Sequence, residues 1–218
     1  MNPRHLPPLP RSPWLGLIIL SAFLACAGPE PAADNKAHLS RQDDLESLYW
    51  ARIDSSRMNF TQADVKFMTD MIAHHAQALV MSRLAPENGA GPTIQVLAAR
   101  IINAQEDEIA TMQKWLRDRD QPVPGPHHHT MDHHHGMPGM LTAGQLDRLA
   151  RLQGPDFDRN FLELMIEHHE GAVYMVRELF KVDGAASGTE AFILASGIHA
   201  EQVTEIERMK RMLEARIN

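Results

Sequence analysis

A stretch of fifteen residues occurs twice in the chain, and this repeat constrains the fold more than any other feature. The copies run from Phe67 to Met81 and from Phe161 to Met175, which is an offset of 94 residues (161 − 67). Seven positions are identical, and they hold phenylalanine, methionine, isoleucine, two adjacent histidines, alanine and methionine. Such a repeat indicates that one structural unit is present twice.

The helix expected after each copy repeats as well. The pattern Gln-x-x-Glu-Ile-x-x-Met occupies 105–112 and again 202–209, 97 residues later. The duplicated unit is therefore a pair of helices. One amphipathic hairpin cannot bury its apolar face alone, but two hairpins can bury their faces against each other. The sequence predicts an all-α four-helix bundle made from a duplicated helical hairpin.

Local signals place the expected helices. Thr61, followed by Asp64 three residues later, is typical of a helix N-terminus, and Thr142 is expected to cap a short helix. Glycine and proline interrupt the chain between the long helices. We expect long helices at about 61–84, 93–119, 156–180 and 189–216. The domain would then span 61–218, with repeat one at about 61–119 and repeat two at about 156–216. No convincing strand pattern occurs.

The first 26 residues are typical of a bacterial export signal. Arg4 and Arg11 precede an apolar run over 14–24, and Cys26 follows, with small neighbours. The end of this segment resembles a lipobox, although Phe23 stands where leucine is preferred. We expect cleavage before Cys26 and lipidation of its thiol; the alternatives are an ordinary signal peptide or an uncleaved anchor. The predicted location is the periplasm-facing side of a membrane, where the protein is a lipid-anchored lipoprotein.

Residues 27–60 are expected to be a tether and lead-in, and 45–53 to be either a short helix or irregular. Loss of Arg4 and Arg11 would change the formal charge from −7 to −9. This charge argues against nucleic acid as a partner and against electrostatic binding to anionic lipid. It favours the attraction of cations.

Histidine and methionine recur together on the expected helices, which points to a metal. Imidazole and thioether together favour copper, and thioether favours the cuprous ion. Adjacent helical residues diverge by about 100°, so one histidine of each pair should face the bundle interior and the other its rim or a neighbouring helix. Alternatively, the methionines only fill the core and the histidines form structural pairs. The candidate ligands are His74, His75, His168, His169, Met71, Met81, Met165 and Met175, supported by Gln105, Glu108, Gln202 and Glu205.

These motifs resemble those of the bacterial DUF305 family. The resemblance rests on Phe-x-x-x-Met-Ile-x-His-His-x-x-Ala-x-x-Met followed by Gln-x-x-Glu-Ile-x-x-Met, in both halves, and covers about 62–213. It implies an exported, ferritin-like helical protein. Some members are described as CopM-type copper-binding proteins, so the resemblance also implies a copper role.

A second candidate site lies in the glycine- and proline-rich segment 121–140, for which neither helix nor strand is expected. A tract rich in histidine indicates metal binding by its composition. The alternatives are an engineered tag, which the internal position argues against, or a solvated loop without a role. The candidate ligands are His127, His128, His129, Met131, His133, His134, His135, Met137 and Met140.

We therefore expect an exported protein that binds copper, as Cu⁺ or Cu²⁺, or another transition metal. It would sequester copper or pass it, as a metallochaperone, to a copper exporter or another periplasmic copper protein. One alternative is a di-metal oxidoreductase. Di-iron bundles use Glu-x-x-His, and here Met71 and Met165 replace that glutamate. The other alternative is a structural or partner-binding bundle. No catalytic residue is recognised, and we expect no enzyme activity.

Overall fold

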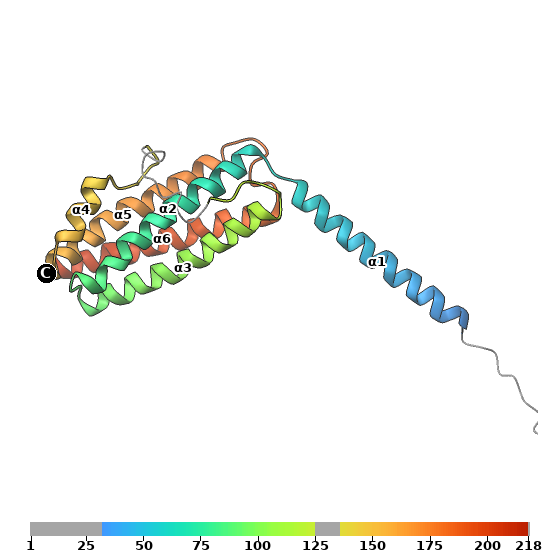
Figure 1. The fold of residues 1–218 in the computed structure, drawn as a ribbon, viewed down its shortest axis with the longest axis horizontal. Helices are drawn as coiled ribbons and strands as arrows, with labels where there is room; N and C mark the ends of the chain where they lie inside the picture. The colour runs from blue at the N-terminus through green and yellow to red at the C-terminus, as the bar shows by residue number, and fades with distance from the viewer. Residues whose placement is uncertain (1–31, 125–135, 218) are drawn as a thin grey trace, which may run out of the picture. The chain divides into compact units, whose positions relative to one another are not determined.

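The computed structural model describes residues 32–124 and 136–217, and within these ranges it contains helices joined by turns and loops and no strand (Figure 1). None of the helices in the described ranges is long and apolar enough to cross a membrane. The apolar run at 14–24 and Cys26 lie outside these residues. The six helices are α1 (Ala32–Met58), α2 (Gln62–Glu87), α3 (Pro92–Arg117), α4 (Ala143–Arg151), α5 (Gly154–Leu179) and α6 (Thr189–Ile217).

The segment expected as an irregular tether is instead largely helical. Helix α1 covers Ala32–Met58, well beyond the short helix considered at 45–53. Ten of its 27 residues are alanine, leucine or arginine (4 + 3 + 3), which have high helix propensity. Residues 45–53 are therefore helical, as one of the two predicted alternatives had it, but the helix is much longer than the short one considered. The role of 27–60 as a tether stays a prediction.

The expected ends of the bundle helices are close to the observed ones. Thr61 caps α2 in a capping box, because its hydroxyl accepts from the Asp64 amide while the Asp64 carboxylate accepts from the Thr61 amide. Thr142 and Gln145 form the same arrangement at α4. Helix α2 continues past the expected end at 84 to Glu87 and holds Pro86 in its last turn.

Two hairpins, α2–α3 and α5–α6, pack together as the predicted four-helix bundle (Figure 1). Buried carboxylates join them. Asp64 at the start of α2 accepts a 2.7 Å hydrogen bond from the amide of Ala186, in the turn before α6. Asp158, 94 residues after Asp64, accepts from the amide of Gly91, in the turn before α3. Each hairpin thus binds the turn of the other, which confirms the duplication in three dimensions.

The core consists of two apolar clusters, one toward each end of the bundle. The first cluster contains Met81 and Met165 together with Leu146 and Leu149 of α4. The second contains Met71 of α2 and its neighbours from α3, α5 and α6. Helix α4 is fixed to the bundle by these leucines; Leu149 is fully buried, so its truncation to alanine should cost about 2–5 kcal/mol.

Candidate metal centre

On each of the four bundle helices, polar side chains occupy the sequence positions between the residues of the two apolar clusters. Together these side chains form a polar layer. The residues of the first cluster on α2 follow position 77, and those of the second precede position 73; the histidines fall between them. The same division holds on the other three helices. All these side chains are buried except that of Glu108, which is partly buried. The layer consists of His74, His75, Gln105, Glu108, His168, His169, Gln202 and Glu205.

His74 of α2 and His168 of α5 face each other, and we call them the facing pair. Their ring centroids are 3.9 Å apart, with 39° between the ring planes. The Nε2 of His74 lies 3.0 Å from the carbonyl oxygen of Pro138. Because a carbonyl only accepts, Nε2 carries the proton, and Nδ1 of a neutral ring then has a free lone pair. Among the described residues, neither that Nδ1 nor either ring nitrogen of His168 makes a hydrogen bond of standard geometry, although the backbone of His74 lies close enough to the His168 ring to raise its pKa against the larger effect of burial.

His75 and His169 differ from the facing pair, because each is bonded to a carboxylate on the next helix. His75 Nε2 lies 2.7 Å from Glu108 Oε2, and His169 Nε2 lies 2.8 Å from Glu205 Oε2. We call them the carboxyl-bonded pair. The Nδ1 atoms of both rings are buried without a hydrogen-bond partner. A ligating histidine commonly donates its other ring nitrogen to a carboxylate, so this arrangement also suits metal coordination.

Burial determines the protonation of the layer. Burial, followed by the charge of neighbouring His75, lowers the pKa of His74 to about 3. Burial, followed by the charge of His169, lowers the pKa of His75 to about 3. Burial lowers the pKa of His168 well below its usual value, and it raises that of Glu108 to about 7. At neutral pH these three histidines are uncharged, which is the state that coordinates metal.

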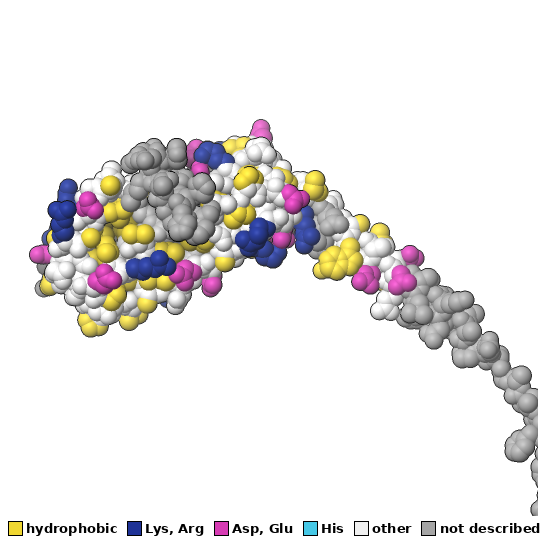
Figure 2. Space-filling view, in the orientation of Figure 1, with side chains coloured by type: hydrophobic (Ala, Val, Ile, Leu, Met, Phe, Trp, Pro, Cys, Tyr) yellow, Lys and Arg dark blue, Asp and Glu magenta, His cyan; other side chains and the backbone are white. Residues whose placement is uncertain are grey.

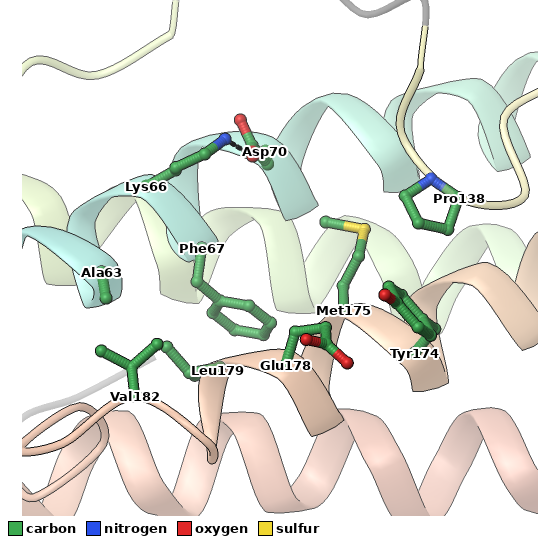
Figure 3. Close-up of a pocket in the computed structure, with 10 residues that line it drawn as sticks. All are labelled: Ala63, Lys66, Phe67, Asp70, Pro138, Tyr174, Met175, Glu178, Leu179 and Val182. Atoms are coloured by element: carbon green, nitrogen blue, oxygen red, sulfur yellow. Dashed lines mark hydrogen bonds and ion pairs between the residues drawn. The ribbon is translucent and has the colours of Figure 1, made fainter.

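The predicted methionine ligands have different environments. Met71, Met81 and Met165 are fully buried, and Met71 and Met165 lie three residues before His74 and His168, about one helical turn away. Met175 is only half-buried and lines a pocket of about 280 Å³ between α2 and α5 (Figure 3).

Among the described residues, no group of three or more histidine, cysteine, aspartate or glutamate side chains is arranged to hold a metal ion. A site in this layer would therefore need thioethers or a shift of side chains. The layer nevertheless has orphaned polar atoms, because neither amide atom of Gln105 or of Gln202 has a hydrogen-bond partner. Buried polar groups without partners are uncommon and often mark functional sites. On the face shown in Figure 2, none of the described histidines is visible.

The second predicted site is only partly described. His127, His128, His129, Met131, His133, His134 and His135 lie outside the described residues, as does Cys26. Met137 and Met140 are described and partly buried. They belong to a segment, Met137–Leu141, that we call the strap.

Sequence reasoning missed how the strap is held. Besides the bond from His74 to Pro138, the Gln77 side chain donates to the Leu141 carbonyl at 3.0 Å and accepts from its amide at 2.7 Å. On α5, a Cβ at Gly171 would lie 2.1 Å from the Pro138 carbonyl oxygen, so only glycine permits this approach. Glycine inside a helix is unfavourable, and Gly171 was the available signal of a close backbone contact.

Known structures resemble this bundle. A DUF305 protein from Streptomyces coelicolor, described as secreted, is 30% identical (TM-score 0.61), covering 71% of this chain and 93% of that chain. A DUF305 fragment from Deinococcus radiodurans is 31% identical (TM-score 0.62), covering 72% and 98%. CopM in its Cu(II)-bound form is 33% identical (TM-score 0.56), covering 70% and 96%.

CopM also matches in Cu(I)-bound and Ag-bound forms, at 31% and 30% identity. No curated protein sequence matches the chain. The family described as "Domain of unknown function (DUF305)" matches residues 64–213, which includes all four bundle helices almost completely. The chain belongs to the DUF305 family.

Proposed function

We propose that this protein binds copper, and that the facing pair is the centre of its bundle site. The observation that carries the proposal is the state of His74 and His168. Their ring centroids lie 3.9 Å apart, and both rings are fully buried. The His74 Nδ1 and both nitrogens of His168 make no hydrogen bond of standard geometry with the described residues. Buried polar groups without hydrogen-bond partners are rare in proteins, so two neighbouring imidazoles with unused lone pairs are not expected in a purely structural core.

The chemistry of the surroundings favours the cuprous ion. Both rings are neutral at physiological pH because burial lowers the pKa of His74 to about 3 and that of His168 well below its usual value. Cu⁺ therefore displaces no proton from them. Thioethers of Met71 and Met165, one turn away on the same helices, are soft donors that prefer Cu⁺. The relatives solved with Cu(I), Cu(II) and silver support the same metal class.

The biological role that we propose is sequestration or handover of copper outside the cytoplasm, without enzyme activity. Cys26 would be lipidated after cleavage of the export signal, and the His/Met tract at 127–140 would capture copper before the bundle stores it. A copper exporter or another periplasmic copper protein would be the partner. The secreted relative supports export, and thioether donors suit an oxidising compartment because they form no disulfide.

Equilibrium dialysis against Cu⁺ and Cu²⁺ tests the proposal. The double variant His74→Leu/His168→Leu removes the facing pair while keeping similar side-chain volume. We expect this variant to bind less Cu⁺ per chain than the unchanged protein. The difference is the amount of Cu⁺ held at the bundle site. Copper should also raise the melting temperature of the unchanged protein, since a ligand of the native state stabilises it. Equal copper binding by the two proteins would refute a site at the facing pair.

A further inference from the structure

The two copies of the repeated frame differ at eight of their fifteen positions, and at one of these positions both residues hold the strap. Gln77 of α2 and Gly171 of α5 are equivalent, since 171 − 77 = 94. Gln77 binds the Leu141 backbone through two hydrogen bonds, and Gly171 leaves room for Pro138 and Gly139. A Cβ at Gly139 would in turn lie 2.7 Å from the carbonyl oxygen of Glu167. The two residues at this position differ, and each allows its own helix, α2 or α5, to hold the strap.

The strap also connects the facing pair to a pocket. The carbonyl oxygen of Pro138 accepts from His74 Nε2, and Pro138 also lines the pocket between α2 and α5. In the view of Figure 3, the sulfur of Met175 lies between Phe67 and Pro138. A single residue of the strap therefore contacts the buried histidine and the accessible thioether site.

The symmetry-related end of the α2–α5 groove is closed. Met81, the equivalent of Met175, is fully buried in the apolar cluster that contains Leu146 and Leu149 of α4. Helix α4 follows the strap directly in the chain and packs on α2 and α5. Only the Met175 copy of the frame has a partly exposed thioether. The asymmetry thus gives the bundle a soft donor that solvent can reach on one side of the facing pair.

We propose that the pocket lined by Met175 is the port through which Cu⁺ reaches the facing pair, and that the strap is its gate. This inference rests on the proposed function. Met175 would receive the ion, and displacement of Pro138 would release Nε2 of His74 and open the path inward. Entry is an exchange of neutral ligands around Cu⁺, so no electron is transferred and no bond of the chain is broken.

The first test replaces the receiving donor. Met175→Leu keeps an apolar side chain of similar size but removes the sulfur. Transfer of Cu⁺ from a coloured chelator to the full chain is followed by absorbance, with His74→Leu/His168→Leu as the background to subtract. We expect the uptake rate to fall about tenfold, equivalent to about 1.4 kcal/mol of barrier, with the final amount of bound Cu⁺ unchanged. The matched control is Met212→Leu, a partly buried methionine packed at the other cluster.

The second test opens the gate. Gly171→Ala places a methyl group against Pro138, so the strap must move and the His74–Pro138 bond is lost. A hydrogen bond contributes about 1 kcal/mol net, so uptake and release should both become about fivefold faster. Gly197→Ala is the control, because a Cβ at Gly197 meets nothing within 4 Å. Should Gly171→Ala not fold, Gln77→Leu removes the two hydrogen bonds between Gln77 and Leu141, which loosens the strap on α2, and the same expectation applies.

The outcomes separate the two proposals. If Met175→Leu takes up Cu⁺ as fast as Met212→Leu, the pocket is not the port. If Gly171→Ala takes up Cu⁺ only as fast as Gly197→Ala, the strap is not the gate. Loss of equilibrium binding in Met175→Leu would make Met175 a ligand of the final site and would also overturn its role in entry. If the unchanged protein binds no more Cu⁺ than the facing-pair variant, the proposed function itself fails.

Discussion

The two histidines of each His-His dipeptide are one residue apart, yet they have opposite surroundings. Among the described residues, His168 makes no hydrogen bond of standard geometry through either ring nitrogen, whereas His169 is bonded to Glu205 at 2.8 Å. His74 and His75 differ in the same way, with a backbone carbonyl for one and Glu108 for the other. The rotation of about 100° per residue directs one ring toward the opposite hairpin and the other toward its own. Two adjacent histidines can therefore have different roles: one has a ring nitrogen free to bind a metal, and the other is held in place by a carboxyl group.

The largest expected effect is the loss of stability of the folded protein in acid. His74 and His75 have a folded pKa of about 3 against 6.5 in the unfolded chain, and that of His168 is also lowered. As pH falls below 6.5, the unfolded chain binds protons that the folded state does not, so stability falls. Glu108 acts oppositely: its pKa is raised from 4.5 to about 7, so its contribution is greatest below 4.5 and is lost as pH rises through 7.

Three histidines lower the stability as the pH falls and one carboxyl raises it, so the net free energy of unfolding should fall by about 2 kcal/mol between pH 7 and pH 5.5. Urea denaturation of the metal-free protein at pH 7 and pH 5.5 measures this loss. The variant His74→Leu/His168→Leu should lose much less stability over the same interval. Equal stability of the unchanged protein at both pH values would show that the buried histidines gain or retain protons.

Substitutions at adjacent positions should have unequal costs. His169→Leu leaves Glu205, whose side chain is only 4% exposed, without its partner, and breaking such a buried pair costs about 3 kcal/mol. His168→Leu removes two ring nitrogens that make no hydrogen bond of standard geometry and should cost about 1 kcal/mol at most. Melting of the two metal-free variants, followed by circular dichroism, compares them directly. Equal destabilisation would mean that His168 has structural partners comparable to those of His169.

The fold was predictable because its determinants are local or repeated. The capping box of Thr61 and Asp64 and the 94-residue repeat fix the helices and their hairpin arrangement. The pairing of His75 with Glu108 was not predictable, since it joins side chains 33 positions apart on two helices. The approach of Pro138 to Gly171 depends on where the strap crosses α5. Periodicity alone could not say which histidine of each dipeptide faces the other hairpin.

Replacement of the buried thioethers should have a smaller effect than loss of the facing pair. Met71→Leu and Met165→Leu are volume-conserving, so each should cost less than about 1.5 kcal/mol of stability. If these sulfurs coordinate Cu⁺, each substitution should lower its affinity about tenfold, equivalent to about 1.4 kcal/mol. Cu²⁺ should be affected less, because thioether is a soft donor. Competition with a Cu⁺ chelator measures the change, and unchanged affinity would identify both methionines as core residues only.

The smallest effect on stability and on Cu⁺ affinity is expected for a substitution of Glu108. This substitution also tests whether the facing pair and the carboxyl-bonded pair really differ in metal binding. With a pKa of about 7, Glu108 is mostly protonated at pH 6, and glutamine has nearly the shape of that neutral acid. Glu108→Gln should therefore change the stability of the metal-free protein by no more than about 1 kcal/mol at pH 6. If only the facing pair binds Cu⁺, its affinity should stay within about threefold of the unchanged value, since 1.4 kcal/mol would be needed for tenfold.

A carboxylate that orients a ligating histidine behaves differently, because its loss typically lowers metal affinity about 10–100-fold. A fall of that size in Glu108→Gln would place His75 among the ligands and would end the division between an available pair and an anchoring pair. Glu205→Gln makes the same comparison at the other hairpin, where the carboxyl is more deeply buried. A loss in one variant alone would mean that the duplicated halves bind copper unequally, although their sequences repeat the same ligand pattern.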